Sequence, residues 1–251
     1  MHIQIVLFDG FDPLDVIAPY EVLHAGGSAS GGAVTVELVT AEGPREVVGG
    51  TGGLALRATS TLDLERADVL LVPGASGRVG EPGEVPEVDA DADAEAEGGA
   101  GAEAGGEVGS GSGSGERRQD EFIPVLLGRT LTTELPALLK QAMEDPDITV
   151  ATVCGGSLVL ALAGLLEGRH ATTHHLGLDM LDATGVHAVR ARVVDDGDLI
   201  TGAGVTSGLD LGLYLLEREL GPRVAHAVEE LFAYERRGTV WRARGPVPTA
   251  F

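Results

Sequence analysis

Cys154 is the only cysteine among the 251 residues of this chain, and it stands where a strand gives way to a helix. Residues 148–153, directly before it, are mostly β-branched or apolar, as in a buried parallel strand. Directly behind it, a Gly-Gly-Ser turn leads into residues 158–166, an apolar run that predicts a helix. A thiol on so sharp a turn projects from the sheet beside the positive end of a helix. That position lowers a thiol pKa and predicts a nucleophile.

Asp15 is the candidate acid–base partner of this thiol. It lies early in an expected helix, just after the loop 9–14 that follows the first strand. A carboxyl beside a thiol can hold or pass a proton, and when protonated it can donate a hydrogen bond to a thiolate. The alternative is an exposed carboxylate at a helix start, just as a lone cysteine can be a small buried hydrophobic residue.

Backbone amides supply the candidate anion donors. The tight loop after residues 69–72 presents Gly74 and Ala75, and the cysteine turn presents Gly155. An N–H from the loop and one from Gly155 would form an oxyanion hole. His174 and His175 are the remaining acid–base candidates. Adjacent residues of a strand face opposite sides and no third ligand accompanies the pair, so we expect no metal. The sequence contains no cofactor motif, so we also expect no cofactor.

The overall composition, 43% hydrophobic and 22% charged, is that of a globular protein. The formal net charge of −22 opposes binding to a phosphate backbone, so we expect no nucleic-acid partner. A single cysteine excludes an internal disulfide framework and a multi-cysteine metal site. The chain has no run of apolar residues long enough to span a membrane and no leader-like start, so we expect a cytoplasmic protein without membrane contact.

Residues 80–121 differ sharply in composition from the remainder, being rich in Gly, Ala, Ser, Asp and Glu. From Glu81 to Glu121 there are thirteen acidic and two basic residues, a net of −11, which is half of the formal net charge of −22. Such a segment cannot bury enough apolar surface to offset its ordering entropy. We expect a disordered insertion in a surface loop, with an acidic interaction segment as the sharper alternative, interrupting one domain that spans residues 1–251.

Outside that insertion the chain alternates strands and helices, which predicts an α/β fold with a mostly parallel sheet covered on both faces. The expected strands are 3–8, 34–39, 69–74, 149–153 and 171–174, with 189–194 and 199–201 flanking a hairpin turn. The expected helices are 13–25 (stopped by two glycines), 133–143, the run behind Cys154, 209–220 and 223–234. In such folds ligands bind beyond the carboxyl ends of the strands, where Asp15, Gly74 and Cys154 would meet.

Four motifs in this order resemble the ThiJ/PfpI superfamily, relatives of the class I glutamine amidotransferases, over the whole chain apart from the insertion. They are Asp9-Gly10-Phe11 with Leu14-Asp15 and Pro19-Tyr20-Glu21-Val22, Leu71-Val72-Pro73-Gly74, Val153-Cys154 continuing through Gly156 to His174, and Gly202 to Asp210. The resemblance implies a flavodoxin-like three-layer sandwich, usually a homodimer. It also implies a nucleophilic Cys154 with an acidic partner at Asp15, and His174 falls where some members carry a histidine near the sulfur.

Within the superfamily the motifs most resemble the isonitrile hydratases. The function implied is cysteine-dependent hydration of a small isonitrile to an N-substituted formamide through a thioimidate on Cys154, without a cofactor. The alternative is a non-catalytic module that binds a ligand or senses oxidants through its thiol. Gly155 departs from both the Thr that typically follows the cysteine of the hydratases and the His of the related proteases.

Overall fold

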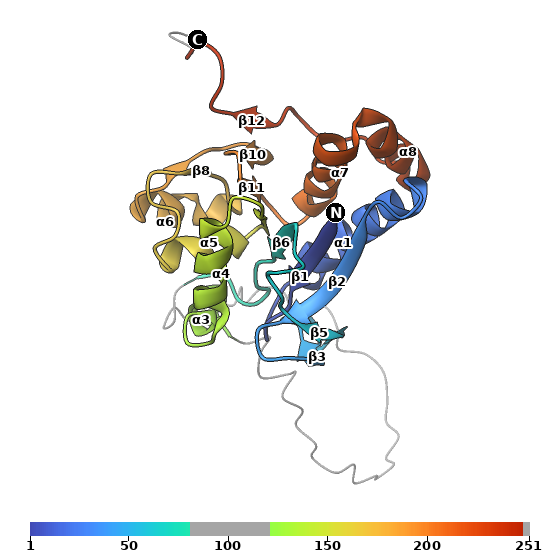
Figure 1. Ribbon diagram of the computed structural model, residues 1–251. Coiled ribbons are helices and arrows are strands. Elements are labelled where there is room, and N and C mark those ends of the chain that lie inside the picture. Colours follow the sequence, from blue (N-terminus) through green and yellow to red (C-terminus); the bar gives the residue numbers. More distant parts are fainter. Residues whose placement is uncertain (81–120, 248–251) are drawn as a thin grey trace, which may run out of the picture.

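The computed structural model describes residues 1–80 and 121–247, and in it a central sheet is flanked by helices on both faces (Figure 1). The sheet runs in the order β12-β10-β11-β7-β6-β1-β2-β5. Helices α1, α7 and α8 pack together on one side, while α3, α4, α5 and α6 lie on the other (Figure 1). This is the three-layer flavodoxin-like arrangement that the sequence predicts.

The elements have the following bounds. The strands are β1 His2–Val6, β2 Thr35–Thr40, β3 Arg45–Val48, β4 Ala55–Ala58, β5 Ser60–Thr61, β6 Val69–Val72, β7 Thr149–Val153, β8 His170–Ala171, β9 His187–Ala188, β10 Val193–Asp195, β11 Leu199–Gly202 and β12 Trp241–Arg242. The helices are α1 Pro13–Ala29, α3 Ile123–Thr130, α4 Leu135–Glu144, α5 Gly156–Leu162, α6 Leu178–Ala183, α7 Ser207–Leu220 and α8 Pro222–Phe232, with a 3₁₀ turn at His175–Gly177.

Parallel pairing dominates the sheet, as the buried apolar strands predict. Strands β1, β2, β6, β7 and β11 pair in parallel. At one edge β10 pairs antiparallel with β11, and β12 follows parallel to β10. The β10–β11 connection is the expected hairpin at residues 195–198. Strands β3 and β4 form a separate antiparallel pair, which the sequence analysis missed.

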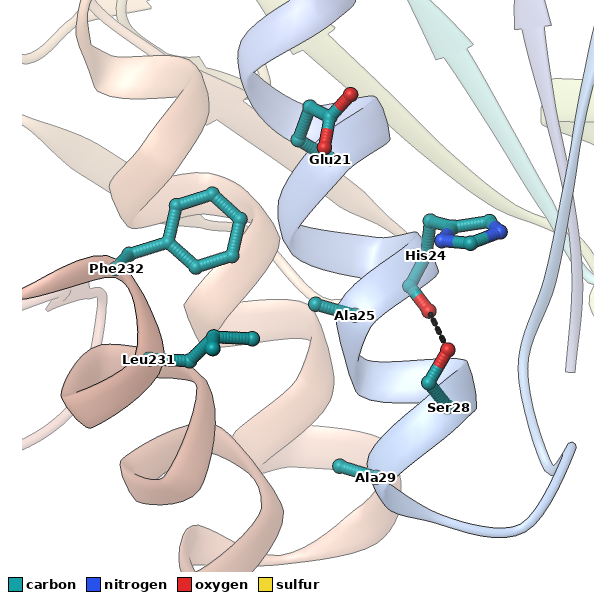
Figure 2. A pocket seen from close by; sticks show the side chains of 7 residues that line it. All are labelled: Glu21, His24, Ala25, Ser28, Ala29, Leu231 and Phe232. Atoms are coloured by element: carbon teal, nitrogen blue, oxygen red, sulfur yellow. Dashed lines mark hydrogen bonds between the residues drawn. The ribbon is translucent and has the colours of Figure 1, made fainter.

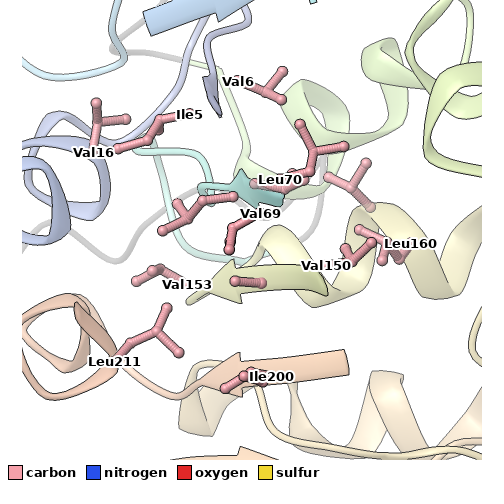
Figure 3. Close-up of a cluster of buried hydrophobic side chains, with 14 of the residues drawn as sticks. Ile5, Val6, Val16, Val69, Leu70, Val150, Val153, Leu160, Ile200 and Leu211 are labelled. Carbon is pink, nitrogen blue, oxygen red and sulfur yellow. The ribbon is translucent and has the colours of Figure 1, made fainter. Parts of the chain in front are cut away.

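Apolar side chains from both faces of the sheet form the core (Figure 3). Strand residues such as Ile5, Leu70 and Val150 are almost completely buried. They meet Val16 of α1, Leu160 of α5 and other helix residues in Figure 3. Each such side chain contributes roughly 1.5–3 kcal/mol to stability when fully buried. The core therefore fixes the carboxyl ends of the strands that carry the candidate site.

Helix α1 does not stop at Gly26 and Gly27 as expected, but continues to Ala29. The two glycines serve close packing instead. A Cβ at Gly26 would lie 2.3 Å from Leu216 of α7, and one at Gly27 would lie 2.3 Å from the carbonyl oxygen of Val34. Since a helix can contain glycine at a cost of about 1 kcal/mol per residue, tertiary contact overrides the stop signal here.

The expected strand over residues 171–174 is wrong. Strand β8 ends at Ala171, and His174 caps the 3₁₀ turn that follows, its Nδ1 accepting the N–H of Leu176 at 3.3 Å. His174 and His175 therefore do not face opposite sides: their ring centroids are 4.2 Å apart. The apolar and β-branched composition of residues 171–173 reflects burial in a loop rather than membership of the main sheet.

Residues 81–120, which contain nearly all of the predicted acidic insertion, lie outside the described residues. The chain on either side of them is joined by main-chain hydrogen bonds. The N–H of Arg78 donates to the carbonyl of Glu121 at 2.9 Å, and the N–H of Ile123 donates to Arg78 at 3.0 Å. The remainder of the fold therefore closes without residues 81–120.

Replacing residues 81–120 by a short Gly-rich linker is expected to leave stability unchanged or raise it by at most about 2 kcal/mol, because a shorter loop has a smaller closure entropy. Urea titration and thermal unfolding of the shortened and full chains measure this. A loss of several kcal/mol would contradict the prediction and would mean that the acidic segment packs on the domain.

Helices in the described ranges, 1–80 and 121–247, include none with the length and hydropathy to cross a bilayer.

Candidate functional site

The candidate site lies beyond the carboxyl ends of three neighbouring strands, β1, β6 and β7. Between β1 and β6 the strand order reverses, because the chain proceeds outward to β2 on one side and to β7 on the other. Such a switch point leaves a crevice that binds ligands in open α/β sheets. The loop after β1 delivers Asp15, the loop after β6 delivers Gly74, and the turn after β7 delivers Cys154.

Cys154 is held in a strained backbone conformation. Its φ is +55°, in the left-handed region that residues with a side chain seldom adopt. Its N–H donates to the carbonyl of Gly202 at 3.0 Å, and its own carbonyl accepts the hydroxyl of Thr173 at 2.7 Å. Strain of this kind amounts to about 1–3 kcal/mol and persists where the surroundings fix it. The thiol that results is 7% exposed.

Asp15 is fully buried in the first turn of α1, a helix capped by the side chain of Asp12. Its Oδ2 accepts the N–H of Gly74 at 2.9 Å. Its Oδ1 has no hydrogen-bond partner among the described residues. A buried carboxyl oxygen without a partner is unfavourable, so this atom is available to a ligand or to the thiol. The alternative of an exposed helix-start carboxylate is wrong.

Glycine at position 74 allows the three loops to touch. A Cβ there would lie 2.6 Å from the nitrogen of Gly155 and 2.8 Å from Oδ2 of Asp15. Gly156 is equally constrained, since its Cβ would lie 2.1 Å from the carbonyl oxygen of Val72. The glycines therefore bring the cysteine turn, the β6 loop and the Asp15 carboxyl into direct contact.

Burial raises the pKa of both acids in this pair. For Asp15 the largest cause is desolvation, followed by the negative charge of Asp12, which also raises the pKa. For Cys154 desolvation and then the charge of Asp15 raise the pKa, and the N–H of Gly155 lowers it by less. The expectation of a lowered thiol pKa is wrong here, because one amide and the short helix α5 do not offset burial beside a carboxylate.

Of the three amides expected as anion donors, two have partners and one does not. The N–H of Gly74 is engaged by Asp15, and the N–H of Gly155 is directed to the sulfur of Cys154. The N–H of Ala75 has no hydrogen-bond partner within the described part of the chain, although the residue is only 3% exposed. Ala75 is therefore the donor of the three that is free to meet an anion.

His174 lies beside Gly204, and it is not among the groups that shift the pKa of Cys154. A Cβ at Gly204 would lie 3.5 Å from its ring, and the adjacent Thr173 holds the cysteine carbonyl. Desolvation, followed by the neighbouring His175, lowers the pKa of His174, while Asp12 raises it. The imidazole is consequently neutral near pH 7, and because Nδ1 accepts the Leu176 N–H, its proton is on Nε2.

Asp12 is a residue of the site that the sequence analysis did not single out. Its N–H donates to the carbonyl of Gly74 at 2.9 Å, and its charge acts on Asp15, Cys154 and His174. The available signal was its place as the helix cap before Pro13, which by itself indicates only a structural role.

A second concave region, the groove between α1 and α8 in Figure 2, contains none of the candidate site residues. It is lined by Glu21, His24, Ala25, Ser28, Ala29, Leu231 and Phe232. Glu21 is exposed on the helix surface there. Within the described ranges no group of three or more His, Cys, Asp or Glu side chains is arranged to hold a metal ion.

The strand order and the three-layer packing define a flavodoxin-like α/β protein with a cysteine on a strained strand–helix turn. Residues 129–218 match the model of the DJ-1/PfpI family. The chain is 32% identical over 237 residues to the isonitrile hydratase of Pseudomonas putida, covering 93% of this chain and 78% of that protein. The chain belongs to the DJ-1/PfpI (ThiJ/PfpI) family.

Solved structures agree with this fold. A ThiJ/PfpI family protein from Pseudomonas syringae matches with a TM-score of 0.64 and 24% identity, covering 94% of this chain and 76% of that one. Drosophila melanogaster DJ-1beta matches with a TM-score of 0.65 and 16% identity, covering 93% and 98%. At these identities the likeness establishes the fold alone.

Proposed function

We propose that this protein is a cysteine-dependent hydratase of small isonitriles, with Cys154 as nucleophile and Asp15 as the acid–base group. The observation that carries the proposal is the contact of a strained, buried thiol with a buried carboxyl that has one unpaired oxygen. The 32% identity to an isonitrile hydratase over 93% of the chain supports this reaction. A DJ-1/PfpI fold alone would not specify it.

The reactive state that we propose is a protonated Asp15 beside a Cys154 thiolate. Both groups are buried, so both resist carrying charge, and two adjacent negative charges are the least favourable arrangement. A single negative charge shared by the pair avoids that repulsion. Protonated Asp15 then donates a hydrogen bond to the thiolate, while the N–H of Gly155 donates a second.

In the first step the thiolate attacks the terminal isonitrile carbon, forming the carbon–sulfur bond. Asp15 gives its proton to the same carbon, which yields a neutral thioimidate and a carboxylate. In the second step water adds to that carbon: Asp15 takes a proton from the water and passes it to the nitrogen. Loss of the thiolate, with the hydroxyl proton returning to Asp15, leaves the formamide and restores the starting state.

The remaining candidates bind rather than react. We propose that the free N–H of Ala75 meets the nitrogen or oxygen that carries negative charge in these steps. Gly74 positions the Asp15 carboxyl through its N–H instead of meeting the substrate. Neutral His174 offers its Nε2 proton at the crevice edge, where it would orient water or substrate.

The direct test is the appearance of an N-substituted formamide when the protein is incubated with a small neutral isonitrile, followed by proton NMR. A covalent adduct on Cys154, the sole cysteine, would be seen by mass spectrometry of the quenched reaction. No formamide above the buffer rate, with a well-folded protein, would contradict the proposal.

Leu127 of α3 occupies the space that a side chain at position 155 would enter. A Cβ at Gly155 would lie 3.2 Å from Cδ1 of Leu127, although the backbone φ of −69° accepts any residue. The packing of Leu127 therefore favours glycine over the Thr that is typical at position 155.

Gly155→Thr alone is expected to destabilise the fold by about 1–3 kcal/mol, because the new side chain overpacks against Leu127. Combined with Leu127→Ala, it is expected to be better tolerated than in the native background, giving a favourable coupling energy in urea titrations of about 0.5–3 kcal/mol. A hydroxyl at this position is also expected to raise the hydration rate. Additive stability effects would show that the two side chains do not meet, and an unchanged rate would favour the alternative below.

The second candidate function is a non-catalytic module that binds a ligand or senses oxidants through Cys154. The observations that favour it are the burial that raises the thiol pKa and the glycine at position 155. Oxidation of Cys154 by peroxide without any turnover of isonitriles would support this role. A homodimer, with a small molecule as the only other partner, remains part of our proposal, and light scattering measures the mass of the assembly.

A further inference from the structure

Asp12 is fixed beside Gly74, the residue that separates the Asp15 carboxyl from the cysteine turn, by its own backbone and side chain. Its N–H donates to the carbonyl of Gly74, and its Oδ1 accepts the N–H of Leu14, each at 2.9 Å. The N–H of the same Gly74 donates to Asp15, so Asp12 and Asp15 are bound to the carbonyl and the N–H of one residue. The position of the Asp12 carboxylate relative to the buried pair is consequently rigid.

The exposure of these groups differs. Asp15 is fully buried and Cys154 is 7% exposed, whereas Asp12 is only partly buried. Of the three acidic groups, the Asp12 carboxylate is therefore the one that is accessible to water. The charge of the same carboxylate also raises the pKa of His174, so it acts on a second group of the candidate site.

Cationic side chains do not balance this charge. Among the charges acting on Asp15 and His174 in the described structure there is no Lys or Arg. Basic side chains of neighbouring segments have other partners. In the loop after β6, Arg78 lies over the ring of Phe122, and Arg169 before β8 pairs with Asp196 and Asp198. Arg45 pairs with Asp9 and Glu42. The formal net charge of −22 adds to the local negative potential.

We propose that Asp12 is a specificity-determining residue that restricts the site to neutral or cationic electrophiles and excludes anionic ones. The inference deepens the proposed function and rests on it, because it names the charge class of the isonitrile that Cys154 accepts. A carboxylate-bearing isonitrile would be a poor substrate, and its neutral ester a good one.

Alkylation of Cys154 measures the discrimination independently of turnover. Iodoacetamide is neutral and iodoacetate is anionic, and with either the thiolate forms a carbon–sulfur bond as iodide leaves. Because both reagents react with the same thiolate, a change in the thiol pKa cancels from the ratio of their rate constants. As the sole cysteine, Cys154 can be followed by intact-protein mass spectrometry.

In the native chain the ratio of iodoacetamide to iodoacetate rate constants is expected to exceed that of a free cysteine derivative by roughly three- to ten-fold. Asp12→Asn keeps a capping side chain but removes the charge. It is expected to lower the ratio most of the way to that of the free cysteine derivative. Added salt screens the Asp12 charge and should therefore also lower the ratio of the native chain.

Asp145→Asn is the matched control. Asp145 also accepts a main-chain N–H two residues on, from Asp147 at 2.9 Å, but it precedes β7 and so lies at the opposite end of the strand from Cys154. Its substitution removes one charge and is expected to leave the ratio unchanged. An equal effect of both variants would overturn the proposal, because it would show that the net charge of the protein, and not Asp12, sets the ratio. So would a native ratio that Asp12→Asn does not alter, or a Cys154 that iodoacetamide cannot reach.

The proposed function is judged separately, with methyl isocyanoacetate and isocyanoacetate as the neutral and anionic substrates. Hydration of neither, together with an Asp12-dependent alkylation ratio, would contradict the hydratase and leave the role of Asp12 supported. Hydration of both at equal efficiency would support the hydratase and overturn the role of Asp12.

Discussion

Cys154→Ser is expected to reduce the rate of isonitrile hydration on the order of 10⁴-fold or more, since a serine hydroxyl without a strong base is a poor nucleophile. The smaller oxygen fits the same turn, and the main-chain bonds to Gly202 and Thr173 remain. Steady-state formation of the formamide measures the loss.

Thermal unfolding provides the control for this variant, because the melting temperature is expected to remain near that of the native chain. Cys154→Ala should be equally inactive, which separates the missing thiol from any effect of the new hydroxyl. Turnover retained by either variant would remove Cys154 from the mechanism, whatever the stability of the protein.

Asp15→Asn is expected to lower kcat by about 10²–10⁴-fold, because the amide can hydrogen-bond to the sulfur but cannot transfer a proton to carbon. Gly74 can still donate to the amide oxygen, so the loop geometry should persist. Steady-state kinetics with a neutral isonitrile measure kcat, and an unchanged value would refute the proton-transfer role.

The same variant is expected to change the pH dependence of stability. Burial raises the pKa of Asp15, so the folded state binds this proton more tightly than the unfolded state does. The associated stability is present below the ordinary aspartate pKa of about 4 and is lost as pH rises through the higher folded value. Asp15→Asn should therefore become more stable than the native chain as pH increases, in urea titrations between pH 4 and 8.

Asp145→Asn serves as the control for this pH dependence, because Asp145 is exposed. It should leave the difference in stability between low and high pH unchanged. A native-like pH dependence in Asp15→Asn would show that Asp15 ionises in the folded chain as easily as in the unfolded one.

The sequence predicted the sheet and the cysteine turn well because both have strong local signals. Strand β7 is a run of buried residues in which every member of 150–153 is inaccessible, and a Gly-rich turn follows it. The hairpin around residues 195–198 and the helices α4, α7 and α8 were recovered within a few residues for similar reasons.

Other features depend on contacts between distant parts of the chain. Helix α3 is short, starts beside the acidic segment, and is positioned by Leu126 against Gly10 and by Leu127 against Gly155. The raised pKa of the thiol depends on complete burial beside Asp15, which residue spacing does not reveal. The histidine pair was misplaced because residues 171–173 have a strand-like composition but are buried in a loop.

The positive φ of Cys154 means that the thiol loses its orientational entropy when the protein folds, before any substrate arrives. The cost of this strain is met once, when the protein folds, and the proposed nucleophile then already has a fixed orientation. A flexible thiol would lose that orientational freedom again in every encounter with a substrate. In the proposed reaction, part of the folding free energy of the domain would thereby lower the activation barrier in every turnover.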